Sequence, residues 1–115
     1  MVQIKKNSEK IHWTKHSKRK MVHYQLSESR VLRVLRYPDR KEKGIAPETI
    51  ALMQRAGSKK HPYEIWLMYQ AFKIKKNHKS QIKIISTWKY PGISPIGESI
   101  PIPDDIAREL RRMLA

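Results

Sequence analysis

The segment from residue 12 to residue 38, HWTKHSKRKMVHYQLSESRVLRVLRYP, constrains the fold more than any other part of the chain. It indicates two short helices joined by a tight corner, because Thr14 and Ser27 suit N-caps and Pro38 prevents the second helix from running on. Each helix has one apolar side, formed by Trp13, Met21 and Tyr24 in the first and by Val31, Val34 and Leu35 in the second. The opposite sides are almost wholly basic. Such a pair must pack on a core and turn its basic side to an anionic partner.

The charge of the whole chain supports that conclusion. Its 115 residues are enough for one domain, and 25 Lys and Arg stand against 10 Asp and Glu, a net charge of +15. This excess predicts a polyanionic partner, which is nucleic acid, an anionic membrane face or an acidic protein. A membrane is disfavoured, because no apolar run approaches the length of a span and neither helix pairs a large apolar face with its basic side.

The residue types also exclude several chemistries. The chain has no cysteine, so it forms no disulfide and fits a reducing cytoplasm; its N-terminus lacks the apolar region of a secretory signal. Five histidines occur without an HExxH pattern, and four glycines form no phosphate-binding loop. We therefore expect no metal and no cofactor.

Residues 1–11 are predicted to be a polar lead-in with a short edge strand at residues 2–4, and the remaining chain predicts strands after the helices. Strands are expected near residues 39–43 and at 49–55, 64–72 and 81–90, with a cationic loop at 73–80. The expected fold class is α+β, with the N-terminal helix pair packed on a small antiparallel sheet. In the last strand, alternation places Ile82, Ile84, Ser86 and Trp88 on one face, and Lys83, Ile85, Thr87 and Lys89 on the other.

The C-terminal segment carries three basic and four acidic residues, unlike the rest. We divide the chain into a core at residues 1–90 and a Pro-rich loop with a final helix at 91–115, packed on the same single domain. The helix is expected from Asp104 to Leu114, packing through Ile106, Leu110 and Met113. The alternative is that Asp104 and Asp105 fold back over the basic face as an internal cover.

A family resemblance rests on Trp13-Thr14-x-His16 and Met21, on Leu26-Ser27 with Val31 and Val34-Leu35, and on the strand Ile84-Ile85-Ser86-Thr87-Trp88. These motifs resemble a small bacterial family of unknown function with a Thr-x-His-Ala-x-x-Arg-Met helix motif. That family is similar in layout to the RelE and BrnT toxins, in the fold group of barnase, EndoU and colicin-type ribonucleases. Ser17 and Gln25 depart from its pattern. The resemblance spans roughly residues 11–90 and implies a RelE-like fold.

The same resemblance implies RNA cleavage without a metal, in which a ribose 2′-hydroxyl attacks the adjacent phosphate. Such a site needs a group that titrates near neutrality and several surrounding cations. His16 is the candidate acid or base, on one helix stripe with His12, Arg19 and His23. The alternative is a polar helix side whose histidine bonds the neighbouring strand. The proposed catalytic set is completed by Arg33, Lys89 and Tyr90.

Further cations suit contacts to a phosphate backbone, because arginine offers a planar fork of donors and lysine a mobile charge. These are Arg19, Lys20, Arg30, Arg36, Lys59, Lys60 and Lys83. An ordinary solvated face is the alternative for the arginines of the second helix. Trp66, Tyr69 and Trp88 are predicted to be core residues and not base platforms.

Three functions remain open on these grounds. The first is an RNA-binding protein that also cleaves RNA, with an acidic antitoxin-like protein as partner. The second is a non-catalytic nucleic-acid-binding module, whose binding would depend on salt but whose histidines would be incidental. The third is an interaction domain for an acidic protein.

Overall fold

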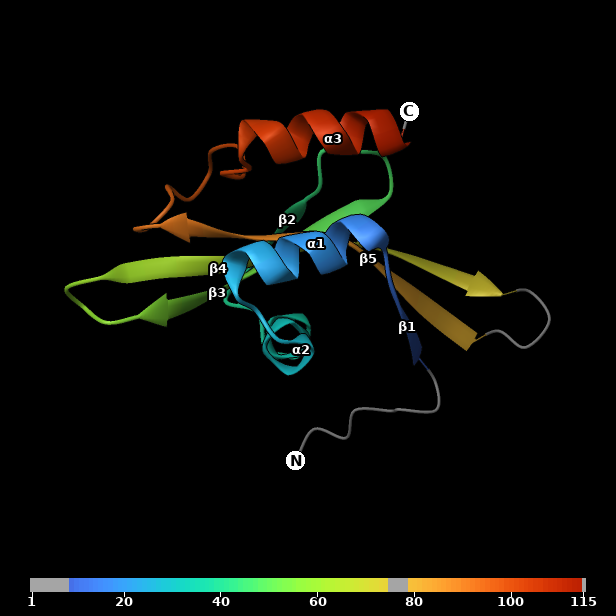
Figure 1. The fold of residues 1–115 in the computed structure, drawn as a ribbon, viewed down its shortest axis with the longest axis horizontal. Helices are drawn as coiled ribbons and strands as arrows, with labels where there is room; N and C mark the ends of the chain where they lie inside the picture. Colours follow the sequence, from blue (N-terminus) through green and yellow to red (C-terminus); the bar gives the residue numbers. More distant parts are fainter. Residues whose placement is uncertain (1–8, 75–78, 115) are drawn as a thin grey trace.

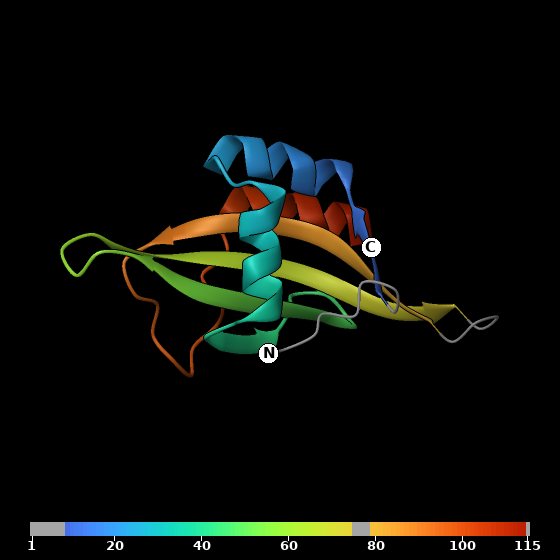
Figure 2. The ribbon, with the colours of Figure 1, turned by 90° about the horizontal axis from the view of Figure 1, so that it is seen from below.

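The computed structural model describes residues 9–74 and 79–114, and within these the chain forms one five-stranded sheet and three helices. The elements are β1 (Glu9–Trp13), α1 (Lys15–Tyr24), α2 (Glu28–Arg36), β2 (Arg40–Lys43), β3 (Thr49–Gly57), β4 (Pro62–Ile74), β5 (Lys79–Pro91) and α3 (Asp104–Leu114). The predicted α+β class is confirmed. Figure 1 shows α3 above one face of the sheet and α2 below the other, and Figure 2 shows α2 crossing the strands.

The strand order is β1-β5-β4-β3-β2, and it departs from the prediction at one edge. Strands β2 to β5 pair antiparallel, but β1 pairs parallel with β5, so the sheet is mixed and the purely antiparallel expectation is wrong. The prediction of a polar lead-in is wrong for residues 9–11, which belong to strand β1. In this strand Ile11 and Trp13 pack on the core, and Lys10 and His12 alternate with them. The strand predicted at residues 2–4 lies outside the described residues.

Two apolar cores lie on opposite faces of the sheet. The face that we call the α2 face packs Met21 of α1 and Val31 and Val34 of α2 against the sheet, chiefly Leu52, Ile65, Leu67, Ile82 and Ile84. The α3 face packs Ile106 and Leu110 of α3 against Ala51, Met53, Trp66, Met68, Ile85 and Trp88. Trp66 and Trp88 are fully buried, which confirms them as core residues, and Tyr69 packs partly buried on the α2 face.

A β-bulge in β5 changes which residues share a face. Met68 pairs with Ser86 but Tyr69 pairs with Ile84, so Ile85 is an extra residue in β5. Ile82 and Ile84 therefore join the core of the α2 face, whereas Ile85 and Trp88 join that of the α3 face. The uniform alternation predicted for 81–90 is wrong for this reason.

The helix boundaries follow the local signals. The hydroxyls of Thr14 and Ser27 accept from backbone N–H groups of the first turns, and α2 ends at Arg36 before Pro38, as predicted. Trp13 belongs to β1 and not to the first helix. The predicted loop at 73–80 is shorter, because β4 runs to Ile74 and β5 starts at Lys79, and its centre lies outside the described residues.

The final helix follows the predicted bounds. Ile106 and Leu110 are buried as expected, but Met113 is 45% exposed and does not complete the packing. None of the described helices has the length and hydrophobicity needed to cross a bilayer.

Candidate nucleic-acid interface

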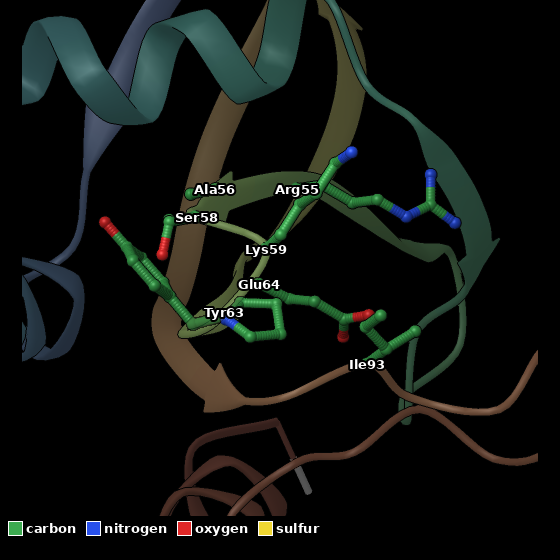
Figure 3. Close-up of a pocket in the computed structure, with 9 residues that line it drawn as sticks. Arg55, Ala56, Ser58, Lys59, Tyr63, Glu64 and Ile93 are labelled. Carbon is green, nitrogen blue, oxygen red and sulfur yellow. The ribbon is translucent and has the colours of Figure 1, made fainter.

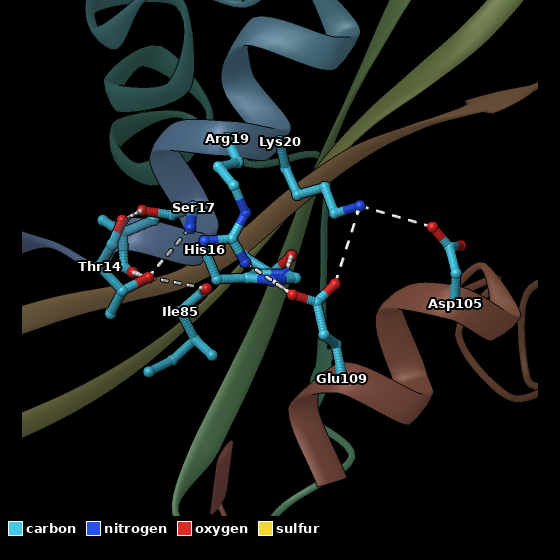
Figure 4. Close-up of polar contacts among 10 residues, drawn as sticks. Thr14, His16, Ser17, Arg19, Lys20, Ile85, Asp105 and Glu109 are labelled. Atoms are coloured by element: carbon cyan, nitrogen blue, oxygen red, sulfur yellow. Dashed lines mark hydrogen bonds and ion pairs between the residues drawn. The ribbon is translucent and has the colours of Figure 1, made fainter. Parts of the chain in front are cut away.

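His16 lies buried between three elements. Strand β1 pairs only with residues 80–84 of β5, and Thr14 then donates from its N–H and its hydroxyl to the Ile84 carbonyl. This fixes the start of α1 beside the rest of β5 and turns His16 inward, where it is 2% exposed. Its Nε2 lies 2.8 Å from Ser86 Oγ and its Nδ1 lies 3.1 Å from Glu109 Oε2 (Figure 4). Both ring nitrogens thus face protein groups.

Two carboxylates of α3 meet the basic side of α1. Arg19 Nη2 donates to Glu109 Oε2 at 2.7 Å, and Lys20 Nζ lies 3.4 Å from Asp105 Oδ2 and 3.9 Å from Glu109 Oε1 (Figure 4). The contact with His16 lowers the pKa of the Glu109 carboxyl most strongly. Desolvation opposes this effect, and Arg19 and Lys20 add to the lowering. Arg19 and Lys20 are therefore neutralised within the chain.

This arrangement combines the two alternatives for the last helix. Its apolar side packs on the sheet, and Asp105 at the same time covers part of the basic face. Glu109 was missed from the sequence, although its spacing of four from Asp105 places both on one side of a helix.

The burial of His16 argues against its predicted role as a general acid or base. A general acid or base must reach the proton that it transfers, and this ring is almost inaccessible. The stripe expected to surround it is not assembled, because His12 lies in β1 and His23 is exposed with its ring edge-on to Tyr24. The structure matches the alternative reading, in which the histidine bonds a neighbouring strand. Catalysis by His16 stays a prediction that requires α3 to move.

The Glu109 contact predicts a pH dependence of stability. Because the pKa of Glu109 is lower in the folded than in the unfolded chain, its ionised form stabilises the fold above the unfolded pKa of about 4.3. That stabilisation is lost as the pH falls through the folded pKa. We expect the melting temperature of the wild type to fall by several degrees more than that of Glu109→Gln between about pH 5 and pH 3. Glu98→Gln, at an exposed position, is the control, and parallel curves for wild type and Glu109→Gln would contradict the prediction.

A second group of cations gathers on the α2 face around Tyr63. Arg30 Nη1 donates to Gln54 Oε1 at 2.5 Å, and Lys89 Nζ lies 5.2 Å from the centre of the Tyr63 ring. Burial lowers the pKa of Arg30, the charge of Arg33 lowers it further, and Tyr63 opposes both. We call Arg30, Arg33, Tyr63 and Lys89 the Tyr63 cluster. It draws side chains from α2, β4 and β5.

The Tyr63 cluster has no acidic partner in the part of the chain that the structure describes. The ion pairs found there use His16, Arg19, Lys20 and Arg40 as the basic members. Arg33 is exposed, while Arg30 and Lys89 are half-buried and their positive charge is not balanced locally. Like charges held together without a carboxylate are a suitable binding site for an anion.

The other predicted residues are dispersed over the surface. Arg36 is exposed in the last turn of α2, and Lys59 and Lys60 are exposed between β3 and β4. Tyr90 packs against the core of the α3 face, so it does not share a site with Lys89, contrary to expectation. Lys83 pairs with His12 and Gln70 in register and lies on the α3 face, also apart from Lys89.

A shallow pocket of about 430 Å³ lies at the β3–β4 hairpin and the start of the following loop (Figure 3). Arg55, Lys59, Tyr63, Glu64 and Ile93 are among its lining residues. The Glu64 carboxylate is already saturated, because it accepts from Trp66 Nε1 at 2.9 Å and from the N–H and hydroxyl of Ser94 at 2.9 and 2.7 Å. Its role is structural. Arg55 pairs with Glu64 in register and lies on the α3 face, so it does not extend the Tyr63 cluster, and Figure 3 shows its side chain directed away from Tyr63.

Over residues 9–74 and 79–114, no three histidine, aspartate or glutamate side chains gather in a way that could hold a metal ion. No protein-family model, curated protein sequence or solved structure matches the chain.

Proposed function

We propose that this chain is an RNA-binding domain whose main contact with RNA is a phosphate group held at the Tyr63 cluster. The observation that carries the proposal is that Arg30 and Lys89 both lie near Tyr63, with Arg33 close enough to Arg30 to affect its charge, and that none of them pairs with a carboxylate among the described residues. The net charge of +15 supports it, because it favours a polyanion over a single small anion.

The chemistry of the cluster suits a polynucleotide backbone. The guanidinium of Arg33 is exposed and can present two parallel donors to one phosphate. Lys89 comes from a different element and approaches the same region as a point charge. Contacts of this kind position RNA but carry no sequence information, so we expect strong salt dependence and little base preference.

The proposal covers RNA binding and does not include RNA cleavage. A RelE-like ribonuclease would need His16, or another titrating group, to face the RNA, and His16 lies beneath α3. The helices α1 and α2 precede the antiparallel strands β3 to β5, which is the order that the RelE-like resemblance implied. The additional strand β1 and helix α3 depart from the helix pair and meander that the resemblance implied.

Replacing Arg33 with Ala tests the proposal. We expect the affinity for a fluorescently labelled RNA, measured by anisotropy at about 100 mM salt, to fall about three- to tenfold. The slope of log affinity against log salt should become shallower by about 0.7, the value for one lost phosphate contact on a single strand. The fold should be unaffected, since Arg33 is exposed and only its backbone is bonded.

Arg108→Ala is the matched control, because it removes the same charge from an exposed position on α3. We expect it to change the affinity less than twofold. An equal loss for both variants would contradict a defined site and indicate diffuse attraction. Equally tight binding of an acidic polypeptide such as polyglutamate would instead favour an acidic protein partner.

A further inference from the structure

Helix α3 covers only part of its face of the sheet. Figure 1 shows β4 and β5 running on past α3 towards the ends at which they are joined. The residues under α3 are apolar, but those beyond it are polar or aromatic, and the register brings them together from three strands. Lys10 and Phe72 pair with Gln81, and His12 and Gln70 pair with Lys83. We call these residues the distal platform: Lys10, His12, Gln70, Phe72, Gln81 and Lys83.

The assignment of these residues to one face follows from the alternation of the strands. Ile11 and Trp13 pack on the core of the α2 face, so Lys10 and His12 lie on the opposite face. Ile82 and Ile84 also belong to that core, which places Lys83 beside His12. The bulge at Ile85 separates this part of β5 from Trp88 and the residues that α3 covers.

The distal platform has one exposed aromatic side chain, Phe72. Phe72 is 40% exposed although it lies in a strand, and the His12 ring lies beside it with centroids 6.3 Å apart and planes inclined by 26°. His12 Nε2 is hydrogen-bonded to Gln81 Oε1, which fixes the imidazole next to the phenyl ring. The His12 ring is thus held beside Phe72 before any ligand binds.

The charged side chains of the distal platform are all basic. Lys10 is exposed and Lys83 is half-buried, and none of the register positions that form the distal platform holds an acidic residue. A protein partner would need a larger apolar centre than one phenylalanine surrounded by lysine, glutamine and histidine. Bases joined by phosphates match this combination of an aromatic face and flanking cations.

We propose that the distal platform binds unpaired bases of single-stranded RNA, with one base stacked on Phe72 and the flanking phosphates near Lys10 and Lys83. This inference rests on the RNA binding proposed above and adds that the bound RNA is single-stranded. A base inside a duplex has both faces covered by its neighbours, so stacking on Phe72 favours unpaired bases. The Tyr63 cluster, which contacts phosphate alone, does not make this distinction.

The test compares one labelled 12-nucleotide RNA as a single strand and as a duplex, with anisotropy as the readout. We expect Phe72→Ala to weaken binding of the single strand about tenfold, as for the loss of one base stack, and to leave duplex binding within about twofold. Phe72→Tyr should keep single-strand affinity, because tyrosine retains the ring. Ile96→Ala, which shortens an apolar side chain that is 77% exposed elsewhere, should have no effect.

Each other outcome overturns the inference in a recognisable way. If Arg33→Ala weakens binding but Phe72→Ala does not, the proposed role of the distal platform is wrong, while the proposed function stands. If Phe72→Ala weakens single strand and duplex equally, stacking of an unpaired base is wrong. If the wild type binds neither RNA, both proposals fall. A melting curve for each variant confirms that it is folded, which we expect because Phe72 is partly exposed.

Discussion

Replacing Glu64 with Ala is expected to lower the free energy of unfolding by about 3 kcal/mol. Glu64 is 1% exposed, and its carboxylate accepts three hydrogen bonds, from Trp66 Nε1 and from the N–H and hydroxyl of Ser94. Alanine would leave these buried donors without an acceptor, and each such loss is costly. It would also remove a negative charge from the surroundings of Arg40, which is 8% exposed and donates to the same Ser94 hydroxyl at 2.9 Å.

The effect should extend beyond a single contact, because Glu64 connects β4 to the segment that leads to α3. Urea unfolding followed by circular dichroism gives the loss of stability. Glu98→Ala is the control, since the Glu98 side chain is exposed. Arg40 donates only to the backbone carbonyl of Glu98, which the substitution keeps. Glu64→Gln should fall between the two, because its amide oxygen can accept but its NH₂ group would face a donor. Equal stabilities of Glu64→Ala and Glu98→Ala would contradict the prediction.

The parts of the fold that the sequence predicted well are those determined by neighbouring residues. A hydroxyl at Thr14 or Ser27 caps a helix through the turn that follows it, and Pro38 ends α2 by its own geometry. The direction of β1 depends on partners in β5 about 70 residues away along the chain, and the bulge at Ile85 depends on how β5 pairs across the hairpin with Met68 and Tyr69 of β4. No local pattern specifies such a pairing, so the mixed sheet and the faces of β5 were not predicted.

The candidate site was likewise predicted only where neighbouring residues determine it. The sequence indicated which residues are cationic, but it did not indicate which of them are neutralised. Arg19 meets Glu109 only because α3 packs beside α1. Arg30 has no acidic partner among the described residues, because α2 crosses the sheet at Gln54 and Tyr63. The distal platform was missed because a strict alternation through 81–90 put Lys83 on the same face as Lys89.

Replacing His16 with Ala is expected to destabilise the chain by about 2–3 kcal/mol and to leave its affinity for RNA unchanged. The ring is 2% exposed and lies between Ser86 Oγ and Glu109 Oε2, so its removal creates a cavity. Ser86 is fully buried and would lose its hydrogen-bond partner in the His16 ring. Nothing that RNA could touch is removed, because the cations of the Tyr63 cluster lie on α2 and β5.

The measurement combines urea unfolding with RNA anisotropy and with incubation of RNA in EDTA, all at a temperature where the variant is folded. His23→Ala, at an exposed position on the same helix, is the control and should change neither stability nor affinity appreciably. Suppose the wild type cleaves RNA and folded His16→Ala does not. The ring must then reach the RNA, which requires α3 to leave the sheet and expose Ile106 and Leu110. Such an opening exposes two fully buried aliphatic side chains at about 1.5–3 kcal/mol each, so cleavage should accelerate in variants that weaken α3 packing. Cleavage that persists in His16→Ala would instead assign the chemistry to another residue and leave His16 a structural role.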